Sequence, residues 1–420
     1  MTAPFRPAPL GPFPAGVNNR LPPTQLEQRN ASGKQTFLRH AVNADITEAG
    51  TLKRRLGYTR VIDATKAHSL WGDEDGSAFF VDNGTLYALS AAAVPTAVRG
   101  GLDPAAPVSY ASPGDGSTYY SNGAAIGRVQ GAADFSVGVP RLSPEPGVSG
   151  LSGGSLPAGV YLVCLTAVNQ ATGEESGSTV PVQVEVPANG KITISNIPAG
   201  YARIYMSPVN SDLLLSTGTA QNYSAGATTS ITVIPTLGGR CQTVLMQQMP
   251  PGNIVRAFNG RLLVASGTVL FYSEPYAFGL YNPAKGYIPF PEVISVLEPC
   301  GGGVFIVADK TYWLPDPIDD SQLSVKSPYA GYARSSARSP DTTDVWWMSP
   351  NGYVVAHEDG SVEYPQDKTI GVPTAKAGAT LYRDADGMKR VTSTLFGTGP
   401  DVAAAGSFME AEIVRKETVL

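Results

Sequence analysis

The sequence is poor in charged residues and in helical patterns. Only 15% of its 420 residues are Asp, Glu, Lys or Arg, against roughly 25% in an average domain. The net charge is −5, whereas a protein that grips a nucleic-acid backbone needs clustered Lys and Arg. We therefore expect no binding to a nucleic-acid backbone, with the short basic run at Lys53 as the one candidate exception. Only Ala91–Ala93 and Val402–Ile413 resemble helices, so the chain should be almost helix-free.

Cysteine and histidine are also scarce. Three cysteines occur, none in a CxxC spacing, at Cys164, Cys241 and Cys300. This odd, sparse count argues against a disulfide framework and suits assembly in a reducing cytoplasm. The three histidines lie far apart, at His40, His68 and His357. A zinc site needs three or four ligands, usually with one short-spaced pair, so isolated core or surface histidines are expected.

Long apolar runs are absent as well. No stretch of about 18 apolar residues exists to span a bilayer. The first residues, Met1 to Pro14, are rich in proline and lack the apolar centre of a signal peptide. We therefore expect a soluble protein without a membrane span, which would leave a cell by a route such as lysis.

Glycine and proline are abundant, with 46 and 35 residues, and they separate short apolar runs. This pattern predicts many turns and many short strands. One hairpin is plain in the sequence: Ala78–Val81 and Thr85–Leu89 flank Asn83-Gly84, a pair that accepts the positive φ angles of a type I′ turn. Similar units recur roughly every 40 residues, the blade length of a β-propeller. We predict about six blades, with further hairpins in 108–126, 254–273, 303–314, 345–364 and 379–395.

The middle of the chain has a different pattern. Residues 141–152 resemble a linker, and five to seven longer strand patterns follow within about 90 residues. Alternation at Val182, Val184 and Val186 gives such a strand one buried face. The fold class predicted is therefore all-β: an irregular β-propeller of about six blades with an inserted fibronectin type III-like β-sandwich.

These patterns divide the chain into five parts. The amino-terminal part begins with an extended, proline-rich arm and continues with strands expected at Gln35–Ile46 and Tyr58–Ile62. The predicted parts are residues 1–62 (arm and first strands), 63–140 (first propeller part), 141–240 (immunoglobulin-like sandwich), 241–400 (second propeller part) and 401–420 (carboxy-terminal tail).

Two passages resemble bacteriophage tail nozzle proteins, also called tail tubular B-like hub proteins. Gly16-Val-Asn-Asn-Arg20 is followed by Ala41-Val-Asn43, and then by the turn Gly50-Thr-Leu-Lys-Arg-Arg-Leu-Gly57. That order and its spacing are similar to the opening of those proteins. The later stretch Val269-Leu-Phe-Tyr-Ser-Glu-Pro-Tyr-Ala-Phe-Gly279 is similar to one of their propeller segments. By motif the resemblance covers residues 16–60 and 250–314.

The resemblance implies a structural role in a virion. Such proteins form a ring, often sixfold, that extends the DNA exit channel and contacts an adaptor and fibres. It implies self-association into a hexamer, passage of genomic DNA without specific binding, and assembly in the bacterial host cytoplasm. This chain is short beside some relatives, so its position could be nozzle, adaptor or tail tip.

Three kinds of motif are candidate sites of chemistry. Asp73-x-Asp75-Gly76 and Asp384-x-Asp386-Gly387 begin like calcium loops but lack the later acidic ligands, so hairpin turns are expected. Gly150-Leu-Ser152-Gly-Gly154 matches the Gly-x-Ser-x-Gly sequence of a nucleophile elbow. It lacks the strand before it and the helix after it that such an elbow needs. The carboxylate pairs Glu174-Glu175 and Asp319-Asp320 are adjacent in sequence, and neighbours on a strand point to opposite faces. We therefore expect no enzyme, and no catalytic, cofactor-binding or metal site.

The candidate interface residues are Lys53, Arg54, Arg55, Trp346 and Trp347. The basic run could contact DNA or an acidic neighbour, although short charge runs are usually solvated. On a strand, the two tryptophans must point to opposite faces, so one of them is expected to be exposed. Trp71 and Trp313 are expected to fill gaps between blades rather than to bind a ligand.

Two functional hypotheses from different classes result. The first is a structural ring protein of the tail. The alternative is a tail-tip propeller that binds a receptor or glycan through an exposed aromatic pocket. An enzyme is the third and least favoured interpretation.

Overall fold

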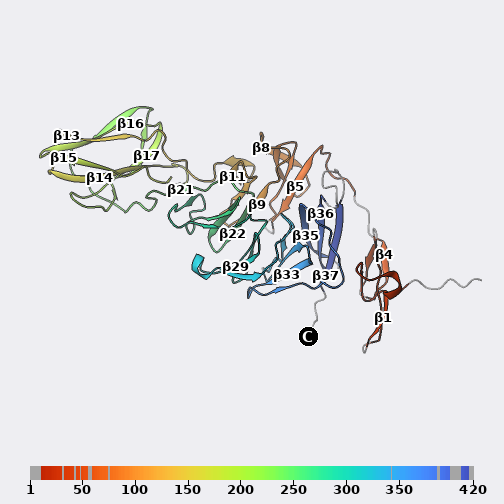
Figure 1. Cartoon of the computed structure of the whole chain (residues 1–420). Helices are drawn as coiled ribbons and strands as arrows, with labels where there is room; N and C mark the ends of the chain where they lie inside the picture. The colour runs from red at the N-terminus through yellow and green to blue at the C-terminus, as the bar shows by residue number, and fades with distance from the viewer. Residues whose placement is uncertain are drawn as a thin grey trace, which may run out of the picture. The chain divides into compact units, whose positions relative to one another are not determined.

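The computed structural model describes residues 11–30, 33–41, 44–47, 49–54, 59–73, 76–341, 343–385, 388–397 and 408–415. The chain has an all-β, propeller-like fold with an inserted β-sandwich (Figure 1). It divides into two compact units: residues 64–290 form one, and residues 1–63 together with 291–420 form the other. The predicted fold class is confirmed.

Six blade-like sheets are antiparallel meanders in which each strand pairs with the next strand of the same sheet, and in the third of them β25 (Leu280–Tyr281) is passed over and pairs with β21 (Gln247–Gln248) instead. Their first strands begin at Ala67, Ser109, Ile254, Val296, Ala337 and Ala377. Neighbouring sheets that the sandwich does not separate therefore start at nearly equal intervals along the chain. The predicted blade-length repeat is confirmed.

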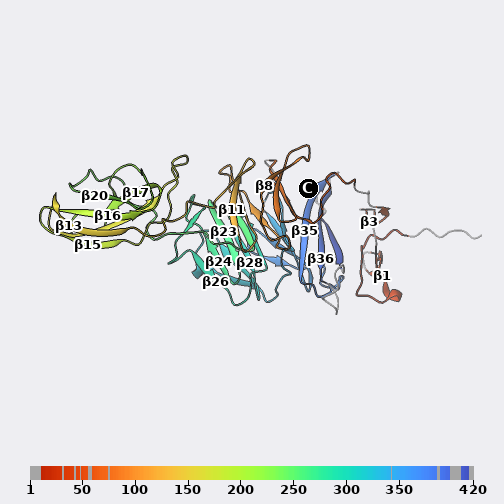
Figure 2. The same ribbon diagram turned by 90° about the horizontal axis from the view of Figure 1, so that it is seen from above.

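Three of these sheets belong to the unit of residues 64–290, and each has four strands. In order they are β5 (Ala67–Gly72), β6 (Ala78–Asp82), β7 (Thr85–Leu89) and β8 (Pro95–Arg99); β9 (Ser109–Ala111), β10 (Thr118–Ser121), β11 (Ile126–Gln130) and β12 (Ala133–Phe135); and β22 (Ile254–Phe258), β23 (Arg261–Ser266), β24 (Val269–Tyr272) and β26 (Tyr287–Pro289). Figure 2 shows strands of the third sheet in green.

The other unit contains two sheets of four strands and one of three. They are β27 (Val296–Cys300), β28 (Gly303–Val307), β29 (Thr311–Pro315) and β30 (Ser324–Ser327); β31 (Ala337–Arg338), β32 (Asp344–Ser349), β33 (Gly352–His357) and β34 (Val362–Glu363); and β35 (Ala377–Ala385), β36 (Met388–Phe396) and β37 (Phe408–Arg415). A short 3-10 helix, η2 (Asp320–Gln322), precedes β30.

Turn chemistry sets the register of these hairpins. Asn83 and Gly84 have φ angles of 47° and 77°, and Asn259 and Gly260 have 43° and 69°. Both central residues of each of these two turns are therefore left-handed, as a type I′ turn requires, and the type I′ turn predicted at Asn83-Gly84 is confirmed. The turn predicted at Asp386-Gly387 lies outside the described residues.

Apolar clusters fill the spaces between successive sheets of the same unit. In the unit of residues 64–290, Tyr120 packs in the cluster shared by the first and second sheets. Its neighbour Tyr119 packs in the cluster shared by the second and third sheets. Trp71 stacks on Phe79 and on Tyr110. The aromatic residues thus bury large areas between blades, and the expectation that they fill such gaps is confirmed.

The inserted sandwich has two antiparallel sheets (Figure 1). Its strands are β13 (Gly147–Leu156), β16 (Gly190–Ile197) and β20 (Ala227–Ile231) in one sheet, and β14 (Gly159–Ala167), β15 (Val182–Val186), β17 (Gly200–Met206), β18 (Leu215–Ser216) and β19 (Gln221–Tyr223) in the other. Val184 and Val186 face one core together with Ile192 and Ile194, while Glu185 is exposed. The predicted alternation is confirmed. A two-stranded ladder of β21 (Gln247–Gln248) and β25 (Leu280–Tyr281) follows.

The linker predicted over residues 141–152 is wrong from Gly147 onward. Strand β13 begins there and pairs with β16. Its glycines hide the strand in the sequence, but they are required by close packing. A Cβ atom on Gly150 would lie 2.1 Å from the carbonyl oxygen of Glu185 in β15, so the backbones of the two strands approach where no side chain fits.

Replacing Gly150 by alanine is therefore expected to destabilise the sandwich. The blocking atom belongs to the backbone, so relief requires a strand to shift, and overpacking of this kind costs about 1–3 kcal/mol. Ser149→Ala, on an exposed position of the same strand, should change stability by less than about 0.5 kcal/mol. Urea denaturation of both variants measures the difference; equal stabilities would contradict the close approach.

The amino-terminal part contains two small hairpins in place of the expected strands. Its elements are η1 (Pro23–Gln25), β1 (Glu27–Asn30), β2 (Gly33–Thr36), β3 (Ala44–Ile46) and β4 (Leu52–Arg54). The single strand expected over Gln35–Ile46 is thus wrong. The strand expected at Tyr58–Ile62 is also absent from residues 59–62, where Val61 is exposed and has no sheet to pack on.

The two candidate helices are not helices where they are described. Residues 91 and 92 form a turn that ends at Ala93 with φ 56°. Residues 408–413 belong to strand β37, and 402–407 lie outside the described residues. No helix within the described parts of the chain is long and apolar enough to cross a membrane.

Candidate functional site

The amino-terminal segment, defined as residues 11–63, buries very little of itself. Among its described residues only Phe13, Asn18 and Gly50 are buried. Its strands form two separate two-stranded ribbons, β1–β2 and β3–β4. Two-stranded hairpins are marginally stable by themselves in water, so this segment depends on contacts outside its own sheets.

The motif pieces that resemble tail nozzle proteins interlock within this segment. Val17 pairs with Leu38 in a parallel bridge, and the Asn18 amide donates to the Leu38 carbonyl at 2.7 Å. The Phe13 amide donates to the Gly50 carbonyl at 2.6 Å. Gly50 has φ 76°, and a Cβ there would lie 2.7 Å from the backbone nitrogen of Pro14, so only glycine fits. Gly57 lies outside the described residues.

Two polar anchors hold the segment to the rest of its unit. The Asn19 side chain accepts a hydrogen bond from the Gly371 amide at 2.6 Å and donates to the Gly371 carbonyl at 3.1 Å. Asp45 in β3 forms an ion pair with Arg390 in β36 at 2.9 Å. These contacts are polar and few, so they fix a position without burying much apolar surface.

The predicted basic run lies on the β3–β4 hairpin. Lys53 and Arg54 are on β4, and both are exposed. Lys53 stands opposite Asp45 in the register, and Arg54 opposite Ala44. Arg55 lies outside the described residues. The structure therefore leaves Lys53 and Arg54 accessible on a segment with little core.

The two tryptophans do point to opposite faces of β32, but the expectation that one is exposed is wrong. Trp346 is 2% exposed and Trp347 is 0% exposed. Trp346 stacks on Tyr382 of the sixth sheet, and Trp347 packs on Phe305 of the fourth. Each face of this sheet is covered by another sheet, so both tryptophans belong to the core.

The two glutamates of the pair Glu174-Glu175 have separate partners. Glu174 accepts two hydrogen bonds from the Arg128 guanidinium, at 2.7 and 2.5 Å. Glu175 forms an ion pair with Arg203 and accepts hydrogen bonds from Tyr205 at 2.8 Å and Thr166 at 2.7 Å. The hydrogen bond from Arg128 lowers the pKa of Glu174. A lowered pKa does not suit Glu174 to the role of a general acid, which needs a raised pKa.

Arg128 and Glu174 were not foreseen as partners. Arg128 lies on β11 of the second blade-like sheet, and Glu174 lies in the loop between β14 and β15 of the sandwich. Arg128 is 6% exposed and its Nε is buried without a hydrogen-bond partner. The pair ties the sandwich to the blade from which the chain departs. No sequence signal marks it, since the residues are 46 positions apart.

The other sequence-level candidates have ordinary structural roles where they are described. Asp73 begins a turn in which its carbonyl accepts from the Gly76 amide at 3.1 Å, and Asp75 lies outside the described residues. Ser152 is on strand β13, not on a linker and not at an elbow. Asp319 accepts from the Ser321 amide at 3.0 Å. His357 pairs with Asp344 at 2.7 Å.

No group of three or more metal-ligating side chains comes together among the described residues. His40 is exposed, and His68 is half-buried with its Nδ1 2.8 Å from the Ser69 hydroxyl.

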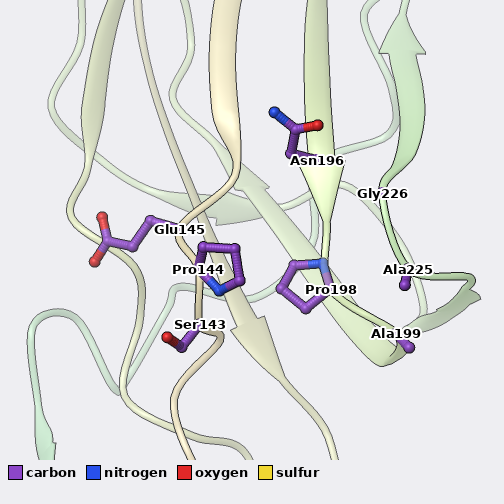
Figure 3. A pocket seen from close by; sticks show the side chains of 8 residues that line it. All are labelled: Ser143, Pro144, Glu145, Asn196, Pro198, Ala199, Ala225 and Gly226. Atoms are coloured by element: carbon purple, nitrogen blue, oxygen red, sulfur yellow. The ribbon is translucent and has the colours of Figure 1, made fainter.

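One cavity of about 510 Å³ lies at an end of the sandwich (Figure 3). It is lined by Ser143, Pro144, Glu145, Asn196, Pro198, Ala199, Ala225 and Gly226. In Figure 3 the Glu145 carboxylate points away from the two proline rings, and it is paired with Arg141. None of the lining residues is aromatic, so this cavity lacks the stacking surface that the glycan-binding alternative needs.

Comparisons with known proteins name no family. No family model matches the chain, and no curated protein matches it significantly. Among solved structures, it is similar to a streptogramin B lyase (12% identity, 79% of this chain and 92% of that chain, TM-score 0.32). It is also similar to BBS1N from a complex with ARL6DN (11%, 78% and 87%, 0.30) and to a virginiamycin B lyase from Staphylococcus aureus (11%, 77% and 90%, 0.30). At these TM-scores the similarities carry no conclusion about activity or partners.

Proposed function

We propose that this protein is a structural component of a bacteriophage tail, of the nozzle or hub type, which assembles into a ring through its amino-terminal segment. The observation that carries the proposal is that, among the described residues of 11–63, almost none is buried in a core of the segment itself. A segment that buries little surface alone gains stability when it docks on a partner. In a closed ring, the partner of each segment is the next copy of the chain.

Two further observations support a structural role. The interlocked motif of Gly16–Arg20, Leu38 and Gly50 is the part of the chain that resembles the opening of tail nozzle proteins. Of the two carboxylate pairs that the sequence singled out for hydrolysis, Glu174-Glu175 is engaged by Arg128 and Arg203. Such carboxylates are suited to joining elements of the fold rather than to transferring protons.

We expect the full-length protein to form a closed oligomer whose assembly depends on this segment. Removal of residues 1–35 should convert the oligomer to monomer, because it deletes β1, η1 and the Val17–Leu38 bridge. The mass measured by light scattering, with rings imaged by electron microscopy, tests this. Circular dichroism on the truncated chain establishes that its β-sheet signal is retained.

A charge variant tests the same interface without deleting any part of the chain. Reversing the exposed Lys53 and Arg54 to glutamate should weaken assembly and make it depend on salt, since exposed charges are screened over about 8 Å at physiological ionic strength. Lys326→Glu is the matched control, because Lys326 is exposed on the outer strand β30. A full-length monomer that binds host surface glycans would overturn the ring proposal in favour of the receptor-binding alternative.

A further inference from the structure

Two buried cysteines that are far apart in the sequence lie together in the sandwich. Cys164 is on β14 and Cys241 is in the segment that leaves the sandwich. They are 0% and 3% exposed and share one apolar cluster with Tyr205 and Leu214. In that cluster each thiol is close enough to shift the pKa of the other. Both residues are free thiols in the structure.

Backbone hydrogen bonds hold the Cys241 segment against β14. The Cys241 amide donates to the Leu214 carbonyl at 3.0 Å, and the Thr243 carbonyl accepts from the Ser178 amide at 2.9 Å. The next residue, Thr179, donates to the Leu165 carbonyl of β14 at 2.8 Å. The juxtaposition of the two thiols therefore rests on the path of the chain and not on side-chain rotamers alone.

The two thiols are chemically unequal. The hydrogen bond from Cys164 lowers the pKa of Cys241 to about 7, and the same contact raises the pKa of Cys164. The thiolate is the reactive form of cysteine, and attack on a disulfide is fastest when the pKa of the thiol is near the ambient pH. Cys241 also lies between exposed Arg240 and Gln242 in residues 232–246, which form no strand. A local opening would therefore uncover it first.

We propose that Cys164 and Cys241 form an intramolecular disulfide when the protein meets a low-molecular-weight disulfide such as glutathione disulfide. The Cys241 thiolate attacks one sulfur of that disulfide, a protein–glutathione bond forms, and one glutathione thiolate leaves. Cys164 then releases its proton to solvent and attacks the Cys241 sulfur, which expels the second glutathione. Two protein thiols are oxidised and one small disulfide is reduced to two thiols.

The bond would pin the exit of the sandwich to β14. It would close a long loop that contains most of the sandwich, and in the chain-entropy model a cross-link over a long loop stabilises the folded state by restricting the unfolded chain. The chemistry is independent of the tail role proposed above. A particle released from a reducing cytoplasm would nevertheless encounter the conditions that favour the bond.

The test uses the full-length protein treated with glutathione disulfide at neutral pH. We expect denaturing thiol titration to fall from three thiols to one, and peptide mass spectrometry to find a Cys164–Cys241 cross-link. The thermal midpoint should rise and return to its starting value after dithiothreitol. Three unreacted thiols, or a glutathione adduct without the cross-link, would overturn the proposal.

Cysteine variants provide the control. Cys300 is also buried, but burial raises its pKa to about 12, so Cys300→Ser should lose both remaining thiols and show the same thermal shift. Cys241→Ser should keep its two thiols and show none. If the thermal shift disappeared in Cys300→Ser, Cys300 would be part of the disulfide, and the proposed Cys164–Cys241 pair would be wrong.

Discussion

Replacing Trp347 by alanine is expected to lower the free energy of unfolding by about 3–5 kcal/mol, the range for truncating a large buried aromatic side chain. Trp347 is fully buried between the fourth and fifth blade-like sheets. Its ring packs on Phe305, which also contacts Trp313, so the cavity would open at the centre of an aromatic cluster. The surrounding strands can close it only by shifting their sheets.

Chemical denaturation followed by far-ultraviolet circular dichroism measures the effect. Leu381→Ala is the control, because Leu381 is 64% exposed on β35 in the same unit, and its truncation should change stability by less than about 0.5 kcal/mol. If Trp347→Ala kept full stability but lost self-association, Trp347 would be an interface residue instead of a core residue. The burial of Trp347 predicts instead that Trp347→Ala loses stability.

The hairpins and the sandwich core were predictable because local chemistry determines them. An Asn-Gly pair between two apolar runs selects one turn type, and the turns at Asn83 and Asn259 follow it. The alternation of Val182, Val184 and Val186 identifies the buried face of β15. The repeat length is equally local, since each sheet is a meander of strands from one short stretch of the chain.

Other features depend on which surfaces meet, and local sequence patterns do not show that. The period of two places Trp346 and Trp347 on opposite faces, but it cannot say that both faces are covered. Strand β13 is rich in glycine and serine, and it has no apolar alternation to reveal it. Its glycines are explained only when Gly150 is seen beside the Glu185 carbonyl oxygen.

The candidate site was predictable in part. The motif at Gly16–Arg20, with Leu38 and Gly50, drew attention to the amino-terminal segment. That these residues bond to one another, and that the segment has little core, required the structure. The Arg128–Glu174 and Cys164–Cys241 pairs join residues far apart in the chain, and their spacing matches no known motif.

Glu174→Gln is expected to destabilise the protein by about 2–3 kcal/mol. The change preserves the side-chain shape but removes the charge that compensates Arg128, and a buried charge left without its partner is costly. We expect less than the roughly 3–5 kcal/mol that is typical of fully buried pairs, because Glu174 itself is 39% exposed. Urea denaturation gives the value. The surface pair Arg141–Glu145 is the control, and Glu145→Gln should cost less than about 1 kcal/mol.

Arg128 is buried and Glu174 is partly exposed, so removing one or the other should not cost the same stability. The difference separates an uncompensated buried charge from the loss of a single contact. Arg128→Met leaves a carboxylate that water can solvate, so it should destabilise less, by about 1–2 kcal/mol. The pH dependence follows the same logic. Because Arg128 lowers the pKa of Glu174, the pair contributes fully above the ordinary glutamate value of 4.5 and loses its contribution as the pH falls through the lowered pKa. Arg128→Met should therefore weaken the loss of stability in acid. If Arg128→Met destabilised the protein as much as Glu174→Gln does, the guanidinium of Arg128 would not be the group that needs compensation.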